Sequence, residues 1–409
     1  MLPRAALLRN SVASSIETST RSLSLHEYQS TEILARHGCS VPKFVVADSA
    51  ARAQEEMEKL KSRRFQVKPQ ILEGMGHLQS AFQTCNSKIQ AIDAVDKMLG
   101  RRIVTEETAA NGPIVKKVMI SESFPVVRKS SLAIMLSRED NGVVIVGRAD
   151  GLDSFKEVIS LSEGVTVEKA MEVAARMQFR GEGQAKAASE IVRLYSTFRS
   201  VDATAIEVAS LVETGDGRVL CLDVSVTVDP YAFYRQKDIF DMENVDELDP
   251  RDVEAHSVGL NYVGLDGNIG CVVNGAGLGL ATMDAVTLAG GRPANFLDMG
   301  GAITEEGMGH AVRIITADPK VGEGGVLDAR SQVRSLLVNA FCGMLDCGSI
   351  ARALIGVARK RPINVPLVVR LQGTNVAEGR RLLRESGLPI IHAEEIDEAA
   401  EKAVAALRE

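Results

Sequence analysis

A glycine-rich turn between two apolar segments is the part of the sequence whose residues best suit chemistry. The run 269–273 has the length and the β-branched content of a strand, and the turn that follows reads NGAGLG at 274–279. Because three of these residues are glycines, backbone N–H groups can approach a phosphate or a carboxylate more closely than a Cβ would allow. A helical pattern over 280–288 and a second strand over 294–297, ending at Asp298, complete a β-turn-α-β unit. Open α/β sheets bind ligands at the carboxyl ends of strands, so this turn is a predicted ligand site.

One interpretation of this unit is a dinucleotide fold. Gly275 and Gly277 open the predicted helix, and Asp298 follows at roughly the twenty-residue distance expected of a ribose-binding acid. The third glycine of that fingerprint is missing, because position 280 is Leu280. A nicotinamide or flavin site is therefore disfavoured.

The letters of the unit also resemble a known family, the β subunit of succinate-CoA ligase. The similar segments are LNYVGLDGNIGC, VNGAG, ATMD and GGRPANFLDMGG within 260–301, LSLHEYQS at 23–30, YRQ at 234–236 and VPLVVRLQGTN at 365–375. The resemblance extends over essentially all of the chain after residue 22. It supplies expectations for the fold, the site residues and the partner, which are given below as such.

Length, charge and cysteine content restrict the class of protein. The chain has 409 residues, 45% of them apolar, which is enough for two hydrophobic cores and predicts two domains. The net charge of -7, with no basic run, argues against binding to nucleic acid, and no stretch approaches the roughly twenty apolar residues of a membrane span. The six cysteines include no CxxC pair, so reduced thiols are expected. Only Cys342 and Cys347 are close enough in sequence to consider a redox role.

Residues 1–22 have the composition of a mitochondrial transit peptide. The segment contains three arginines, Arg4, Arg9 and Arg21, but only one acidic residue, Glu17. It also contains five serines and two threonines. We expect cleavage near Arg21 and a location in the mitochondrial matrix. The alternative is a disordered tail without a targeting role.

For residues 23–245 the resemblance implies an ATP-grasp lobe pair, which is an α+β architecture. The sequence pattern itself predicts a hairpin over 132–146, because Asn141-Gly142 separates two β-branched runs. Two helices are expected within 165–195, broken by the letters GEG at 181–183. The charged stretch 246–259 is predicted to be the linker between the domains.

Residues 260–409 are predicted to form a flavodoxin-like, doubly wound parallel sheet. Five strand patterns alternate with helical segments, at 269–273, 294–298, 335–341, 366–371 and 389–393. The final helical pattern, 395–407, is expected to serve packing only. The glycine-rich segment 321–334 is expected to be an inserted surface loop.

The reaction that the resemblance implies joins succinate to coenzyme A while a nucleoside triphosphate is converted to a diphosphate. It proceeds through a phosphorylated histidine that belongs to an α subunit, which also binds coenzyme A. We therefore expect an α subunit as the partner of this chain, and Mg²⁺ and an ADP- or GDP-type nucleotide as its ligands. The sequence does not discriminate between the two nucleotides, nor between a heterodimer and its double.

In the C-terminal half the resemblance assigns the phosphohistidine and substrate contacts to two turns. Asn274 matches the active-site asparagine of the family, and the alternative is an asparagine that only caps a helix. The second turn contains Gly343, Met344 and Leu345 at a helix N-terminus, whose dipole and free N–H groups stabilise phosphoryl charge.

The second turn departs from the family pattern. Cys342 replaces the first glycine of a pair, Asp346 stands where an arginine is expected, and Gly348 stands where an aspartate is expected. Replacing a cation by an anion at a phosphate site reverses the sign of an interaction worth roughly one or more kcal/mol.

The resemblance places the nucleotide site in the N-terminal half, on Lys68, Gly74, Gly76 and Glu122. Lys68 corresponds to a strand lysine, and the two glycines belong to a loop that wraps the triphosphate through backbone amides and cations. This loop has lost two cations and a glycine and has gained an acid. The altered positions are Glu73, Met75 and Leu78.

For the metal, the family uses an asparagine two residues after a glutamate and an aspartate on the next strand. Glu207 and Asp223 are present, but the asparagine is replaced by Ala209. Mg²⁺ keeps several waters, so the loss of one ligand weakens a site without abolishing it. We expect Glu207 and Asp223 to face each other across a hairpin, and the alternative is two solvated hairpin acids.

Together these patterns predict a β-type subunit of mitochondrial succinate-CoA ligase with a weakened nucleotide site. The rival hypothesis is a catalytically degraded paralogue that retains the α-binding surface and acts as a structural or regulatory partner. The two hypotheses differ in one measurable property, which is whether the chain binds nucleotide.

Overall fold

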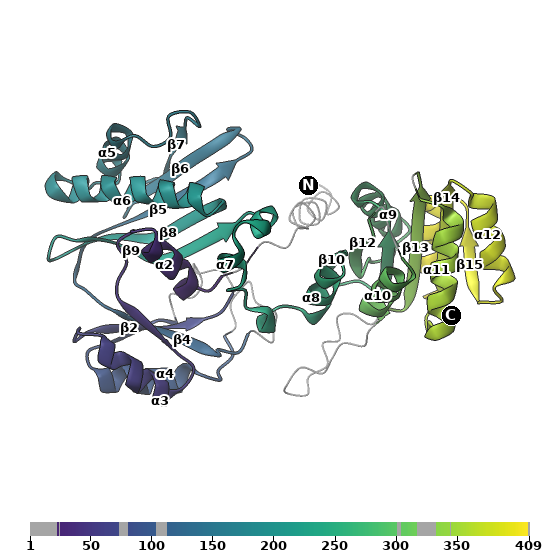
Figure 1. Cartoon of the computed structure of the whole chain (residues 1–409), viewed down its shortest axis with the longest axis horizontal. Helices are drawn as coiled ribbons and strands as arrows, with labels where there is room; N and C mark the ends of the chain where they lie inside the picture. Colours follow the sequence, from purple (N-terminus) through teal and green to yellow (C-terminus); the bar gives the residue numbers. More distant parts are fainter. Residues whose placement is uncertain are drawn as a thin grey trace. The chain divides into compact units, whose positions relative to one another are not determined.

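The computed structural model describes residues 23, 25–72, 81–103, 113–300, 304–316, 333–343 and 345–407. The predicted transit peptide, the loop with Gly74 and Gly76, Met344 and most of the predicted insertion lie outside the described residues. The chain divides into two compact units, one comprising Arg21–Glu247 and the other including Leu248–Glu409 (Figure 1). Among the described helices, none is both long and apolar enough to cross a membrane.

The first unit contains two antiparallel sheets. The smaller sheet has the strand order β1-β4-β2-β3, with bounds Phe44–Ala47, Lys117–Glu122, Phe65–Gln70 and Gln83–Cys85. Helices α3 (Ala50–Glu56) and α4 (Lys88–Met98) cover it, and Ser49 and Ser87 cap their N-termini by accepting from backbone N–H groups. The core of this lobe is a cluster of buried apolar side chains around Phe65.

The larger sheet has the order β7-β6-β5-β8-β9. Its strands are Phe155–Ile159, Gly142–Ala149, Val126–Ser137, Ala203–Thr214 and Val219–Val228. Helices α5 (Val167–Arg176) and α6 (Gly181–Ser200) pack on one face of the sheet, as Figure 1 shows. The predicted hairpin is confirmed as β5–β6, with Asn141 at a φ of 51° in its turn.

The two helices expected within 165–195 are confirmed as α5 and α6, but the break between them lies at 177–180, and the letters GEG begin α6. A Cβ on Gly183 would lie 2.5 Å from Oε1 of Glu213 on β8. A larger residue at 183 would need the end of the Glu213 side chain to move, whereas Gly181 has a φ of 55°, a conformation that favours glycine.

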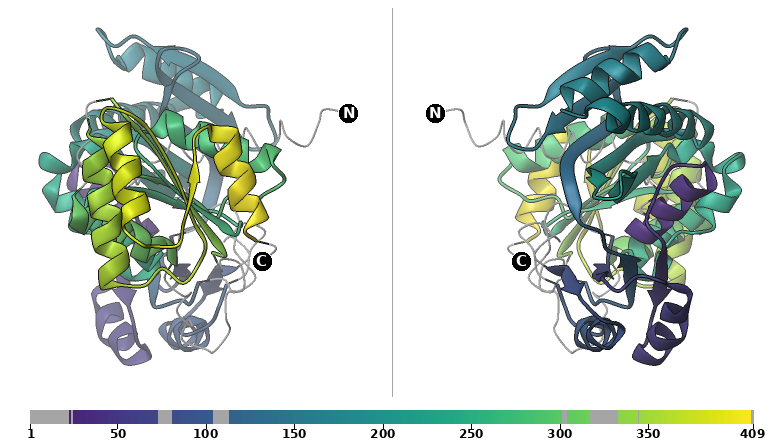
Figure 2. Two further views of the ribbon diagram at one scale, coloured as in Figure 1. Left: turned by 90° about the vertical axis from the view of Figure 1, so that its right-hand side faces the viewer. Right: turned by 90° about the vertical axis from the view of Figure 1, so that its left-hand side faces the viewer.

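Helix α2 (Glu27–Arg36) packs against β9, as the right-hand view of Figure 2 shows for the dark purple helix. The Ser30 hydroxyl accepts a bond from the N–H of Val226, and Leu23 forms a bridge with Val228. After β9 the chain forms short helical segments, η4 (Pro230–Tyr234), α7 (Lys237–Phe240) and η5 (Val245–Glu247).

The second unit is a six-stranded sheet of order β10-β12-β11-β13-β14-β15. Its strands are Asn261–Gly264, Asn295–Asp298, Ile269–Val273, Ser335–Cys342, Leu367–Gly373 and Ile390–Ala393. The five predicted strands are parallel, and the structure adds β10 as an antiparallel edge strand. The central strands β11 and β13 are almost wholly apolar and buried, as strands covered on both faces must be.

Helices lie on both faces of this sheet, which confirms the doubly wound fold (left view of Figure 2). Helices α9 (Ala276–Leu288) and α13 (Ile396–Ala405) pack on one face. The other face is covered by α10 (Glu305–Thr316), α11 (Cys347–Lys360) and α12 (Val376–Glu385), and the segment predicted as a linker contains α8 (Pro250–Ser257).

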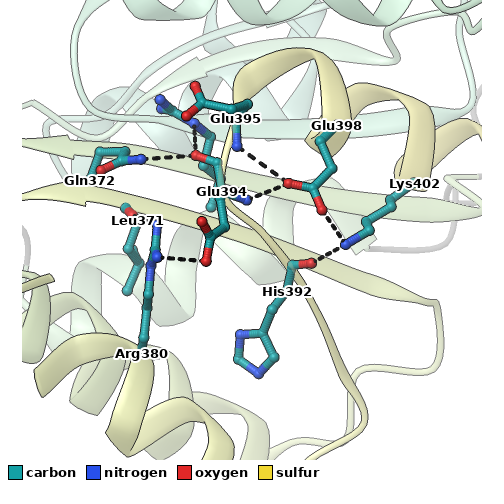
Figure 3. Close-up of polar contacts among 9 residues, drawn as sticks. Leu371, Gln372, Arg380, His392, Glu394, Glu395, Glu398 and Lys402 are labelled. Carbon is teal, nitrogen blue, oxygen red and sulfur yellow. Dashed lines mark hydrogen bonds and ion pairs between the residues drawn. The ribbon is translucent and has the colours of Figure 1, made fainter. Parts of the chain in front are cut away.

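Polar contacts fix the turn from β15 into α13 (Figure 3). The Glu398 carboxylate accepts from the backbone N–H of Glu394 at 2.7 Å and from Lys402, whose ammonium also donates to the carbonyl of His392. The Lys402 ammonium and the backbone N–H groups of Glu394 and Glu395 lower the pKa of Glu398 to about 2. The helix also buries Ala399 and Ala403, which agrees with a packing role.

Candidate functional site

The order of strands reverses between β11 and β13. From β11 the chain passes through α9 to β12 on one side, whereas β13 lies on the other side. Ligands of open α/β sheets bind in the crevice outside the carboxyl ends of strands at such a reversal. Asn274 directly follows β11 and Gly343 directly follows β13, so the fold brings these two predicted residues to the same edge of the sheet.

The Asn274 amide joins the ends of β11 and β13. Its Nδ2 donates to the carbonyl of Phe341, and its Oδ1 accepts from the N–H of Phe341, both at 2.8 Å. The side chain thus continues the pairing of β11 with β13 beyond Val273. Asn274 therefore has a positioning contact in addition to its predicted role in binding a phosphate or a carboxylate.

Gly275 begins the following helix with a φ of 118°, a value that L side chains rarely adopt. Its N–H donates to Oδ1 of Asp298 at 2.6 Å, and the same oxygen accepts from Gly300 at 2.8 Å. Asp298 is 7% exposed, so this carboxylate orders two loops and is not presented to a ribose. No side chain caps α9, whose first-turn N–H groups at Ala276 and Gly277 lie at an exposed helix N-terminus.

The second predicted turn has an anion of its own at the start of α11. Asp346 is the N-cap, and its Oδ1 accepts from the N–H of Ser349 at 3.0 Å. Its Oδ2 accepts from Nδ2 of Asn375 at 2.6 Å, and these donors hold the pKa of Asp346 below its usual range. The resemblance places a negatively charged phosphoryl group at the N-terminus of α11. In this chain the Asp346 carboxylate already places a negative charge there.

The other residues of this turn have separate surroundings. Gly343 is exposed, and its carbonyl accepts from the Thr374 hydroxyl at 3.3 Å. Leu345 is half-buried and packs on the core beneath the sheet. Burial raises the pKa of the Cys342 thiol to about 12 and that of the Cys347 thiol above its usual value, which disfavours a redox role for this pair.

In the first unit, Lys68 is 2% exposed and lies between two carboxylates. Its Nζ donates to Oε1 of Glu27 at 2.5 Å and to Oδ1 of Asp223 at 2.6 Å, and it lies 5.0 Å from the ring centroid of Phe82. Burial opposes the charge of Lys68, but the two carboxylates raise its pKa above the usual value. The predicted nucleotide lysine and the predicted metal aspartate are thus directly paired.

A cavity of about 200 Å³ lies beside this pair. Glu122 and Asp223 both line it, so the structure brings a predicted nucleotide residue and a predicted metal residue together. Lys129 and Ser210 add polar groups to the wall, and Phe124 and Leu222 contribute apolar surface. Of the eleven described residues that line the cavity, seven carry polar or charged side chains.

Glu207 and Asp223 do not face each other, which corrects the prediction for the metal site. Glu207 is exposed and pairs with Ser225, whereas the register places Asp223 opposite Ala209. Asp223 has a φ of 53°. Among the described residues, no group of three or more His, Cys, Asp or Glu side chains is arranged to hold a metal ion.

Both carboxylate oxygens of Asp223 accept hydrogen bonds. Oδ2 accepts from the Ser210 hydroxyl at 2.5 Å, and Oδ1 accepts from Lys68. Burial opposes its ionisation, but these donors hold the pKa of Asp223 below its usual value. Mg²⁺ is commonly bound through one or two carboxylates plus substrate phosphates. The residues therefore fit a magnesium ion that arrives with a nucleotide better than a free-standing metal site.

The site residues of the first unit that the sequence did not identify include Glu27, Lys129 and Ser210. Glu27 lies in the segment LSLHEYQS, whose likeness to the family was the available signal. Lys129 and Ser210 line the cavity from β5 and β8, and only strand pairing brings them to Asp223.

Comparisons with known proteins agree with this geometry. Residues 24–213 match the family described as ATP-grasp domain, and residues 272–404 match the family described as CoA-ligase. The chain is 43% identical to the mitochondrial succinate-CoA ligase [GDP-forming] subunit beta of Caenorhabditis elegans, over 96% of this chain and 97% of that one. It is 39% identical to the Homo sapiens GDP-forming subunit, over 95% and 92% of the two chains.

An ADP-forming relative and a solved structure complete the comparison. The mitochondrial succinate-CoA ligase [ADP-forming] subunit beta of Solanum lycopersicum is 37% identical over 95% of each chain. The structure of ATP citrate lyase from Methanothrix soehngenii, in complex with citrate and coenzyme A, has a TM-score of 0.72. It covers 95% of this chain and 100% of its own at 17% identity, which is a likeness of fold alone.

Proposed function

The chain belongs to the family of succinate-CoA ligase β subunits, and from this membership we propose that it is the nucleotide-binding β subunit of a mitochondrial succinate-CoA ligase. The observation that carries the proposal is identity of 43% to such a subunit over 96% of this chain and 97% of the relative. Each of the two units supports the proposal with a family match of its own. The ATP-grasp match lies in the first unit and the CoA-ligase match in the second.

In this function the two units have different tasks. The cavity beside Asp223 would take the nucleotide, with Lys129 near its phosphates and the apolar surface of Phe124 and Leu222 near its base. The carboxyl ends of β11 and β13 would meet the phosphohistidine of the α subunit through Asn274 and Gly343. Coenzyme A would be bound through the α subunit.

Magnesium would be held by Asp223 together with the nucleotide phosphates, and it would neutralise phosphate charge. Glu207, which is exposed and paired with Ser225, is assigned at most a water-mediated role. Residues 1–22 would direct the chain to the mitochondrial matrix. This agrees with the relatives, whose names describe them as mitochondrial.

We further propose that nucleotide binding is weaker here than the family pattern alone would suggest. Lys68 is held by two carboxylates of the chain, and Ala209 offers no metal ligand. The first feature leaves less of the lysine charge for the nucleotide phosphates, and the second removes an oxygen ligand for the metal ion that would bind with them.

The test is isothermal titration of Mg-ADP and Mg-GDP into the chain from residue 23 onward, with and without the α subunit. Micromolar binding of either nucleotide supports the enzyme, and the tighter nucleotide identifies the natural one. Absence of binding while the α subunit is still captured would reject the enzyme in favour of a structural partner of that subunit.

A further inference from the structure

The segment His26–Ser30 joins the two sheets of the first unit. Ser30 bonds to β9 of the larger sheet through the N–H of Val226. On the smaller sheet, the N–H of Tyr28 donates to Oε1 of Gln70 at 3.0 Å, and Glu27 reaches Lys68 on β2. The cavity beside Asp223 is lined by residues of both sheets, so this segment lies where its two walls are connected.

Within this segment Glu27 is the residue whose burial requires an explanation. It is 7% exposed and lies in the first turn of α2, 41 positions from Lys68 in the sequence. Lysine and glutamate are rarely buried unless they are paired. Here one ammonium is shared by two carboxylates, Glu27 and Asp223, so the cluster holds one carboxylate more than the lysine needs.

The extra carboxylate allows Asp223 to change its partner. If Asp223 turned to a metal-bound nucleotide and Glu27 were absent, neither of the two carboxylates that now pair with the buried Lys68 would remain with it. Breaking a buried ion pair by removal of one partner is strongly unfavourable. With Glu27 in place, Lys68 keeps one partner throughout the exchange.

We propose that Glu27 is a positioning residue of the nucleotide site, which holds Lys68 so that Asp223 can exchange this lysine for magnesium-bound nucleotide. Glu27 acts through Lys68 and does not itself contact the nucleotide. This inference rests on the proposed function of the same cavity, and it assigns the polar segment LSLHEYQS a role in that function.

The measurement is the magnesium enhancement of nucleotide binding, defined as the Kd of ADP in EDTA divided by its Kd in Mg²⁺. It is compared between the unmodified chain and Glu27→Gln, each with its α subunit. We expect Glu27→Gln to lower the enhancement at least about tenfold, because Asp223 must then remain with Lys68. Binding of ADP in EDTA is expected to persist, since the substitution removes a negative charge near the phosphates.

The matched control is Glu32→Gln, the same chemical change on the same helix. Glu32 is paired with the exposed Arg36, so its loss should leave the enhancement unchanged. The melting temperature of each variant is recorded in parallel.

Each result decides between explanations. Equal enhancement in Glu27→Gln and the unmodified chain would overturn the inference while leaving the proposed function in place. Loss of ADP binding in both EDTA and Mg²⁺, together with a lower melting temperature, would show a purely structural role and also overturn it. If the unmodified chain binds no nucleotide under either condition, the proposed function fails and the inference fails with it.

Discussion

The side chain of Asn274 and the backbone of Phe341 form two hydrogen bonds of 2.8 Å that join the ends of β11 and β13. These are the strands between which the order of the sheet reverses. The asparagine is both the residue that the family resemblance assigns to the phosphohistidine site and a brace between the two strand ends. A change at this position therefore has a structural effect that can be measured separately from activity.

Asn274→Ala should destabilise the C-terminal unit by about 1 kcal/mol, because it removes two solvent-exposed hydrogen bonds, which water can partly replace. Urea unfolding followed by circular dichroism checks the free energy of unfolding. Asn261→Ala, at an exposed position on the edge strand β10, is the control and should change stability by no more than about 0.5 kcal/mol. Equal effects of the two substitutions would contradict the bracing role.

Asp346 should oppose phosphoryl binding at the start of α11. Asp346→Asn removes the charge but keeps the N-cap, because asparagine caps as well as aspartate, and it should lower the melting temperature less than Asp346→Ala. With phosphorylated α subunit, the rate of phosphate transfer to ADP should rise. Asp346→Ala, which removes the cap as well, should lower the melting temperature. A transfer rate that does not respond to Asp346→Asn would show that this carboxylate is remote from the phosphoryl group.

Restoring the family residues should strengthen the nucleotide site. The double substitution Leu78→Lys with Ala209→Asn adds a cation for the phosphates and an oxygen ligand opposite Asp223, and we expect the Kd of Mg-ADP to fall at least about tenfold. The control is Leu161→Lys with Ala185→Asn, two exposed positions that are not among the residues lining the cavity. An unchanged and already tight Kd in the restored chain would mean that other residues have replaced these contacts.

Magnesium should bind only together with a nucleotide. Asp223 is the single predicted metal ligand in the cavity, and both of its oxygens accept bonds from Lys68 and Ser210. Titration with Mn²⁺ followed by electron paramagnetic resonance should show no stoichiometric ion without ADP and one with it. Asp223→Asn should abolish the ADP-dependent ion. Stoichiometric Mn²⁺ in the absence of ADP would contradict this prediction.

The pairing of Asp202 with Arg235 should make part of the stability depend on pH. Bonds from Arg235, opposed by burial, and a bond from Gln236 hold the pKa of Asp202 below its ordinary value. A depressed folded-state pKa gives stability that is complete above the unfolded pKa and is lost as the pH falls through the folded value. The difference in unfolding free energy between the unmodified chain and Asp202→Asn should be about 1 kcal/mol or less at pH 7 and should shrink toward pH 3. A difference that is constant with pH would exclude this contribution.

Local features of the fold were predictable because they depend on neighbouring residues. Asn141-Gly142 predicted its hairpin, since these residues accept the backbone conformations of a tight turn. The alternation of apolar strands with helices predicted the doubly wound sheet of the C-terminal unit. The antiparallel strand β10 was not predicted, because its residues are only partly buried and carry no clear period. The break between α5 and α6 was predicted four residues too late, because Gly181 lies at the start of α6 with a positive φ instead of interrupting a helix.

By itself the sequence determined the family, the two-part organisation and the identity of the residues available for chemistry. These properties depend only on residue types and on their spacing over short stretches of the chain. Tertiary structure decided what those residues contact. Lys68 and Asp223 are 155 positions apart, and Asn274 and Phe341 are 67 apart, so no local pattern reports either pairing. Strand register placed Asp223 opposite Ala209, and helix packing brought Glu27 to Lys68. Hydrogen bonds and ion pairs act over a few ångströms, and only the folded chain brings such distant residues within that range.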